Sequence, residues 1–143
     1  MDKREEILNN FYNNDCDEDV RLSSKHGQIE FITTTKYIND YIKPADKILE
    51  IGARTGRYSI HYANLEYDIT AIEYVKHNLE VLKSKIAENM KINAMQGDIL
   101  NLYQLEDNTY DVTLVFGPLY HLLDKEERQK CIKEVYRVLK HGG

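Results

Sequence analysis

Residues 48–59 read ILEIGARTGRYS, a short apolar run that passes through a glycine-containing turn into an amphipathic stretch. This order predicts a strand, a loop and a helix, the usual arrangement of a loop that holds a nucleotide-like ligand. Gly52 and Gly56 let backbone N–H groups approach a ligand closely, and the N-terminus of the following helix favours an anionic group. A tight turn that uses its glycines for geometry alone would look the same. Arg54 occupies the middle of the loop, where a side chain is unusual.

A regular alternation of strand-like and helix-like segments follows Pro44. The predicted strands are 47–51, 67–73, 91–96 and 111–116, and the predicted helices are 55–66, 75–86 and about 124–140. In the last helix we expect a stop at Gly142 and one buried face, made of Ile132, Val135, Tyr136 and Leu139. The alternation predicts an α/β fold with a Rossmann-like parallel sheet and helices on both faces.

The first 44 residues predict two helices separated by a polar linker at residues 13–27. The apolar positions expected to face inward are Ile7, Leu8, Phe11 and Tyr12 in the first helix, and Ile29, Ile32, Tyr37, Ile38, Tyr41 and Ile42 in the second. Ser23 or Ser24 would begin the second helix, and Pro44 would end it. We therefore expect two parts, a helical segment at 1–44 and an α/β core at 45–143.

Composition limits the classes of partner. A chain of 143 residues suits one compact core, and its formal net charge of -5 argues against a nucleic-acid partner. No apolar run is long enough to cross a bilayer and the first residues are charged, so we expect a cytoplasmic protein without a membrane partner. Cys16 and Cys131 have no CxxC partners, and the acidic run 13–19 lacks the features of an EF-hand loop, so no metal site is expected.

Acidic residues end the first two predicted strands. The carboxyl ends of parallel strands meet at one edge of the sheet, where ligands bind. Glu50 could orient the glycine loop or reach an ammonium group. Glu73 lies about 20 residues further on, at the position whose carboxylate accepts hydrogen bonds from two ribose hydroxyls. A helix N-terminal acid stabilised by the helix dipole is the alternative for Glu73.

The third and fourth predicted strands are followed by comparable loops. Asp98 could accept a hydrogen bond from the exocyclic amine of a purine while Ile99 packs on the ring; an ordinary turn aspartate is the alternative. Phe116 precedes a Gly-Pro break, Gly117 and Pro118, after which Tyr120 and His121 would point toward a ligand. A breaker loop before the last helix, with Tyr120 and His121 partly buried, is the alternative there.

Taken together, these residues resemble the class I S-adenosylmethionine-dependent methyltransferases over residues 47–143. The matching motifs are LEIGARTG (49–56), Glu73, GDIL (97–100), YDVTLVFGPLYHLL (110–123) and RVLKHGG (137–143). RLSSKHGQIEF (21–31) resembles the helical cap that small-molecule members place over the cofactor. The resemblance implies a transferase with S-adenosyl-L-methionine as its cofactor and a small-molecule substrate, with a cap at 1–44 and a cofactor-binding core at 45–143.

The resemblance also implies a role for each loop. Glu50, Gly52 and Gly56 would shape the methionine end of the pocket, Glu73 would bind the ribose, Asp98 and Ile99 would hold the adenine, and Phe116 and Gly117 would line the pocket near the sulfonium. The family's reaction is an in-line attack on the sulfonium methyl, in which positioning and exclusion of water supply much of the acceleration. Where a general base is needed, His26 and His121 are the catalytic candidates; an exposed or structural histidine is the alternative for both.

Two departures from the family pattern predict weakened activity. Arg54 replaces the middle glycine of E/D-x-G-x-G-x-G, which would strain the backbone and fill the pocket, or else pair with the cofactor's carboxylate. The chain also stops where the family would begin its fifth strand, so we expect a C-terminally truncated sheet. An exposed strand edge would favour a homo-oligomer, unless the chain is a fragment of a longer protein.

Two other functions compete with methyl transfer. A non-catalytic module derived from a methyltransferase would bind the cofactor without turnover, or use its sheet edge to self-associate. A nicotinamide-dependent oxidoreductase shares the strand–loop–helix plan, but its G-x-G-x-x-G fingerprint needs glycine at positions 54 and 57. This chain has Arg54 and Arg57 there, which argues against that reading.

Overall fold

The computed structural model describes residues 3–12 and 17–143. The chain forms two compact units, Met1–Pro44 and Ala45–Gly143, which are treated separately below. Cys16 and most of the acidic run 13–19 lie outside the described residues. Within the described ranges, no helix is long and apolar enough to cross a membrane. The same residues contain no group of three or more His, Cys, Asp or Glu side chains suited to a metal ion.

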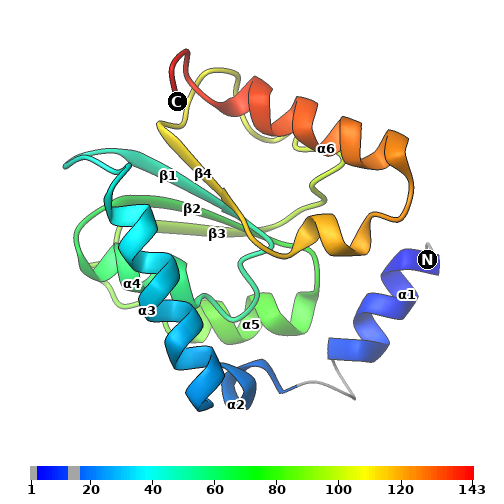
Figure 1. The fold of residues 1–143 in the computed structure, drawn as a ribbon, viewed down its shortest axis with the longest axis horizontal. Helices are drawn as coiled ribbons and strands as arrows, with labels where there is room; N and C mark the ends of the chain where they lie inside the picture. Colours follow the sequence, from blue (N-terminus) through cyan, green and yellow to red (C-terminus); the bar gives the residue numbers. More distant parts are fainter. Residues whose placement is uncertain (1–2, 13–16) are drawn as a thin grey trace. The chain divides into compact units, whose positions relative to one another are not determined.

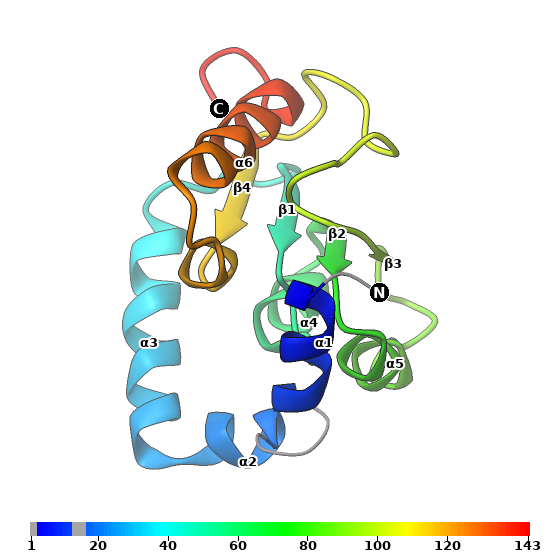
Figure 2. The same ribbon diagram turned by 90° about the vertical axis from the view of Figure 1, so that its right-hand side faces the viewer.

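The second unit contains a four-stranded parallel sheet. Its strands are β1 (Lys47–Ile51), β2 (Asp68–Glu73), β3 (Ile92–Gln96) and β4 (Val112–Val115). They pair in the order β3-β2-β1-β4, and all four arrows point the same way (Figure 2). The predicted α/β fold is therefore confirmed, and the carboxyl ends of all four strands lie at one edge of the sheet.

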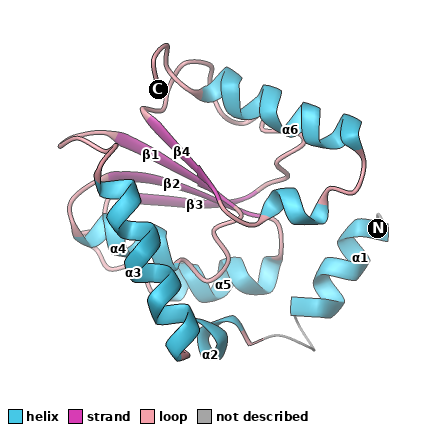
Figure 3. Cartoon of the chain, viewed as in Figure 1, coloured by secondary structure: helices cyan, strands magenta, loops and turns pink. Residues whose placement is uncertain are grey.

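Helices cover both faces of this sheet. The helices α4 (Arg57–Asn64) and α5 (Lys76–Ser84) lie on one face, and α6 (Lys125–Val138) lies on the other (Figure 1). A 3-10 turn, η2 (Pro118–His121), joins the end of β4 to the segment that precedes α6 (Figure 3). Helices on both faces are what right-handed crossovers between parallel strands produce.

Alternation of side chains along the strands divides the core between the two faces. The cluster that includes α6 residues contains Leu49, Ile51, Ile72, Ile99, Leu102, Leu105, Tyr110, Leu122, Cys131 and Val138. A second cluster, which includes Leu82 of α5, contains Ala53, Ala71 and Leu82. Leu49, Ala71 and Ile72 are fully buried, and β2 buries apolar side chains on both of its faces, as expected of a parallel sheet.

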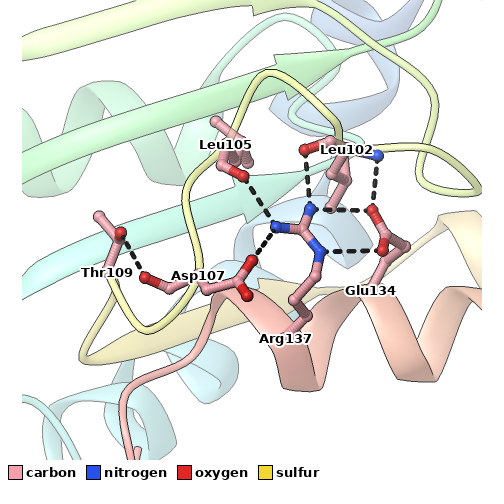
Figure 4. A network of polar contacts seen from close by, with 6 residues as sticks. All are labelled: Leu102, Leu105, Asp107, Thr109, Glu134 and Arg137. Atoms are coloured by element: carbon pink, nitrogen blue, oxygen red, sulfur yellow. Dashed lines mark hydrogen bonds and ion pairs between the residues drawn. The ribbon is translucent and has the colours of Figure 1, made fainter.

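Arg137 joins α6 to the connection between β3 and β4 (Figure 4). Its guanidinium donates to both carboxylate oxygens of Glu134 at 3.0 Å and to Oδ1 of Asp107 at 2.6 Å. It also donates to the carbonyl oxygens of Leu102 at 2.9 Å and Leu105 at 2.8 Å. Hydrogen bonds from Arg137 hold the pKa of the Glu134 carboxyl below its usual value. One side chain thus fixes the loop that follows β3.

The predicted set of buried residues in α6 is partly wrong, because the helix buries a different face from the one expected. The buried residues of this helix are Cys131 and Val138, with Val135 packed against the core, whereas Ile132 and Tyr136 are exposed. The predicted stop at Gly142 is also wrong, because α6 ends at Val138. Leu139 is already extended and forms a parallel bridge with Tyr110, and Gly142 lies in a later turn.

The described residues of the first unit form three α-helices, α1 (Lys3–Asn10), α2 (Glu18–Ser23) and α3 (Lys25–Asn39). The sequence predicted two, and α2 lies within the supposed linker. Its start is stabilised by Asp17, whose Oδ1 accepts from the backbone N–H of Val20 at 3.1 Å. The predicted cap at Ser24 is confirmed: its hydroxyl oxygen accepts from the backbone N–H of Gly27 at 3.1 Å.

Several apolar positions of the first unit do not face inward as predicted. Leu8, Tyr12 and Ile38 are buried. The exposed positions are Ile7, Phe11, Ile29, Ile32, Tyr37 and Tyr41. Burial of Ile38 together with Gly27 and Thr35 shows that the buried stripe of α3 runs along its smaller residues rather than along Ile29 and Ile32.

Candidate functional site

The loop between β1 and α4 has an unusual backbone. Gly52, Arg54 and Gly56 have φ angles of 76°, 52° and 89°, so left-handed residues alternate with ordinary ones. The backbone N–H groups of Gly52 and Ala53 both donate to the carbonyl oxygen of Ile72, at 2.8 and 3.0 Å. The loop is therefore anchored on β2, and Arg54 adopts a conformation that suits glycine.

The glycines of the site are surrounded by side chains. A Cβ atom on Gly52 would lie 2.6 Å from the Pro118 ring, and one on Gly56 would lie 2.7 Å from Leu82. Gly117 has an ordinary φ of -116°, but a Cβ atom there would lie 2.9 Å from Nη2 of Arg54. A Cβ atom at Gly117 would therefore make the guanidinium of Arg54, the flexible end of a long side chain, move away from the space that it occupies beside Gly117.

Glu73 is held rigidly at the end of β2. Its side chain is buried, with 4% exposure. Oε2 accepts from the backbone N–H of Arg54 at 2.7 Å, and Oε1 accepts from the backbone N–H of Val75 at 2.9 Å. Burial raises the pKa of this carboxyl, and the two backbone hydrogen bonds lower it. Each carboxylate oxygen keeps a second lone pair that can accept from a ligand hydroxyl.

Glu50 lies in β1, one of the two central strands, and is directed toward α4. Its carboxylate accepts a hydrogen bond from the hydroxyl of Ser59. Burial is the main cause that raises the pKa of Glu50 to about 7; hydrogen bonds with Ser59 and the charge of Arg54 act against it, and the charge of Glu73 acts with it. Glu50 is therefore a carboxyl that exchanges its proton near neutral pH rather than a permanent anion.

Asn78, a neighbour of Glu73 in the first turn of α5, was not among the site residues predicted from the sequence. Asn78 is buried, with 2% exposure, and its amide lowers the pKa of the Glu73 carboxyl. Its Nδ2 nevertheless meets no acceptor at hydrogen-bonding distance among the described residues. A polar residue within the apolar stripe of Val75, Leu79 and Leu82 was the signal that could have identified it.

Asp98 and Ile99 follow β3 in a compact turn. Oδ1 of Asp98 accepts from the backbone N–H of Leu100 at 3.0 Å, and its carbonyl oxygen accepts from Asn101 at 2.8 Å. Ile99 is buried within the cluster that packs against α6. The turn geometry proposed as the alternative for Asp98 is present, and adenine recognition by this pair stays a prediction.

The residues after β4 and the two candidate histidines differ in their exposure to solvent and in the elements that carry them. Phe116 is 43% exposed, and the centroid of its ring lies 4.9 Å from that of Tyr58 in α4. His121 is half-buried in η2. His26 is exposed at the start of α3, in the other unit. The structure groups Glu50, Glu73, Arg54 and Gly117, whereas the catalytic role of either histidine stays a prediction.

Comparison with known proteins identifies the fold of this site. The protein family described as "Methyltransferase domain" matches residues 48–143. The "Probable tRNA methyltransferase 9B" of Mus musculus is 28% identical over 88% of this chain and 30% of its own length. Demethylmenaquinone methyltransferase of Staphylococcus haemolyticus is 31% identical over 72% of this chain and 43% of its own.

A solved structure agrees with these relatives. The crystal structure of a SAM-dependent methyltransferase from Methanosarcina mazei matches with a TM-score of 0.67 and 26% identity, covering 73% of this chain and 52% of that one. The chain thus spans about half, or less, of the length of these three proteins. Because the family match covers most of the chain, including all four strands and the loops that follow them, this chain belongs to the methyltransferase domain family.

Proposed function

We propose that the second unit binds S-adenosyl-L-methionine at the carboxyl ends of its strands, and that the whole protein transfers the methyl group to a small molecule. The observation that carries this proposal is the Glu73 carboxylate, buried at the end of β2 and oriented by two backbone N–H groups. A carboxylate fixed there is suited to two adjacent ribose hydroxyls. The proposed contacts are Glu50, Gly52, Gly56, Glu73, Asp98, Ile99, Phe116 and Gly117.

The residues present fit one half of this cofactor better than the other. Glu73 and Asp98 supply acceptors suited to ribose hydroxyls and to a purine amine. At the methionine end, the guanidinium of Arg54 already lies against Gly117, where the sulfonium was expected. The nucleoside half therefore fits and the sulfonium half does not, so no step of methyl transfer is derived for this chain.

A small-molecule acceptor is proposed over tRNA. Relatives include an enzyme named for demethylmenaquinone and one named for tRNA, so the family alone leaves both classes open. The formal net charge of -5 disfavours a polyanion, because affinity for nucleic acid depends on neutralising phosphates. We further propose that residues 1–44 act as the helical cap segment of the small-molecule enzymes.

A non-catalytic module is the second candidate function, and Arg54 favours it. An arginine that fills the sulfonium position would permit nucleoside binding without turnover. Self-association is the other form of this candidate, since β4 stands at the end of the strand order in the described sheet and pairs only with β1 there. Sedimentation equilibrium tests this form: a monomer at all concentrations contradicts pairing through β4.

Calorimetric titration tests cofactor binding. The chain is titrated with S-adenosylmethionine and with S-adenosylhomocysteine, beside Glu73→Gln and the matched control Glu88→Gln, which changes an exposed carboxylate in the loop after α5. We expect Glu73→Gln to weaken binding at least about tenfold, as loss of a charged hydrogen-bond acceptor does. Glu88→Gln should bind like the parent chain. Absence of binding by the parent and by Arg54→Gly contradicts the proposed function.

A further inference from the structure

The side chain of Arg54 lies beside Gly117, in the loop after β4. Arg54 stands where the glycine loop of this fold usually carries no side chain, and its φ of 52° keeps the loop in its left-handed conformation. Gly117 needs no special backbone angle, and the room left by its missing Cβ is filled by Nη2 of Arg54. The side chain of Arg54 is therefore accommodated by this chain's own loop after β4, rather than simply displaced toward solvent.

The charge of Arg54 acts on the interior of the site. Its guanidinium lowers the pKa of both buried carboxyls, Glu50 and Glu73. The guanidinium of Arg54 is therefore a cation that belongs to the site itself. A second cation placed beside Gly117 would meet this like charge at short range, in surroundings that screen it less than water does.

We propose that Arg54 is a specificity-determining residue that makes the site prefer adenosine ligands with an uncharged sulfur over those with a sulfonium or an amine at that position. This inference rests on the proposed function, since it concerns the same nucleoside site. S-adenosylhomocysteine, a neutral thioether, is thus the favoured ligand, and S-adenosylmethionine is disfavoured. A domain with this preference retains the demethylated nucleoside and acts as a binding module for it.

A different role for Arg54 makes a different prediction. If the guanidinium instead paired with the carboxylate of the ligand's amino-acid end, it would strengthen every ligand that carries this carboxylate. S-adenosylmethionine, S-adenosylhomocysteine and sinefungin all carry it, whereas only the first and the last have a cation near the reacting centre. The ratio between affinities, rather than any one affinity, therefore distinguishes the two roles.

The test is calorimetric titration of the three ligands into the parent chain and four variants. Arg54→Lys keeps the charge, Arg54→Met removes it at similar length, and Arg54→Gly restores the family residue. Arg57→Met makes the same change of charge three positions away and is the matched control. We expect the parent to bind S-adenosylhomocysteine at least about tenfold more tightly than either cationic ligand, as repulsion between close charges predicts.

The ratios between ligand affinities in the variants test the role proposed for Arg54. Arg54→Met and Arg54→Gly should reduce that preference by about tenfold, whereas Arg54→Lys and Arg57→Met should keep it. An unchanged ratio in Arg54→Met, or equal weakening of all three ligands, overturns the specificity role while leaving nucleoside binding intact. Absence of binding by every variant, Arg54→Gly included, overturns both this inference and the proposed function.

Discussion

The backbone N–H of Arg54 donates a hydrogen bond of 2.7 Å to Oε2 of Glu73. This bond links the loop after β1 to the acid that ends β2, and it is formed while residue 54 is left-handed, with a φ of 52°. The loop has therefore kept its shape with arginine at the middle position. Backbone strain at Arg54 is balanced by the anchoring of the loop on Ile72 and Glu73.

Glycine at position 54 should relieve this strain. We expect Arg54→Gly to have a higher free energy of unfolding than Arg54→Ala, by about 1 kcal/mol, because both variants lack the guanidinium and only glycine adopts a left-handed conformation without penalty. Urea unfolding followed by circular dichroism measures the difference. Equal stability of the two variants would mean that the left-handed angle at this position is not maintained.

Glu66 offers an independent test of the same principle outside the site. It follows α4 with a φ of 68°, and the bonds from Glu66 N–H to Ala63 and from Tyr67 N–H to Tyr62 form a Schellman motif. Glu66→Gly should raise the free energy of unfolding by about 0.5–1 kcal/mol. The same change at exposed Glu80, inside α5, should lower it by about 1 kcal/mol. Destabilisation by Glu66→Gly would contradict the assigned cap.

Much of the fold could be predicted from periodicity, because the strands are short apolar runs bounded by turn residues. The sequence located β1 at its observed bounds and the other strands within a residue or two. It missed α2, since a polar helix that is stabilised by the Asp17 cap has no apolar stripe to reveal it. It placed Ile132 and Tyr136 in the core of α6, whereas Cys131 and Val138 are buried, because several faces of that helix carry apolar residues.

The candidate site was predictable in its outline but not in its contacts. Strand-end positions identified Glu50 and Glu73, since parallel strands bring their carboxyl ends together. The fit of Arg54 against Gly117 could not be read from the sequence, because the two residues are far apart along the chain and Gly117 needs no special backbone angle. Asn78 was missed for a similar reason: its relation to Glu73 depends on the turn between β2 and α5.

Replacement of the Arg137 guanidinium by an ammonium group should lower the free energy of unfolding. Arg137→Lys keeps the charge but loses the planar fork that reaches Glu134, Asp107 and two carbonyl oxygens. We expect a loss of about 2 kcal/mol in the free energy of unfolding, from hydrogen bonds that a lysine cannot all replace. The control is the reverse change at an exposed site of the same helix, Lys133→Arg, which should leave stability within about 0.5 kcal/mol. If Arg137→Lys loses no more stability than this control does, the hydrogen-bond network of Arg137 has no structural role.

Burial of Glu50 should make the stability of the chain fall as pH rises toward neutrality. The folded-state pKa of Glu50 is about 7, raised from 4.5 by burial, so the folded chain holds a proton that the unfolded chain has released. Its contribution to the free energy of unfolding is therefore greatest below pH 4.5, declines between pH 4.5 and about 7, and is constant above that range. The decline is roughly 3.5 kcal/mol at most, because the pKa differs by about 2.5 between the folded and the unfolded chain and a difference of one corresponds to about 1.4 kcal/mol.

Glu50→Gln isolates this contribution, because glutamine still accepts from Ser59 but carries no charge at any pH. We expect the variant to match the parent near pH 4.5 and to be more stable than it at pH 8. Glu73 also has a raised pKa and gives a slope of the same sign in both proteins. Because the charges of Glu50 and Glu73 interact, loss of the Glu50 charge also eases ionisation of Glu73, which adds to the difference between parent and variant with the same sign. Urea unfolding at a series of pH values measures that difference, and a parent that gains stability over the variant as pH rises would show that Glu50 is charged and well solvated in the folded chain.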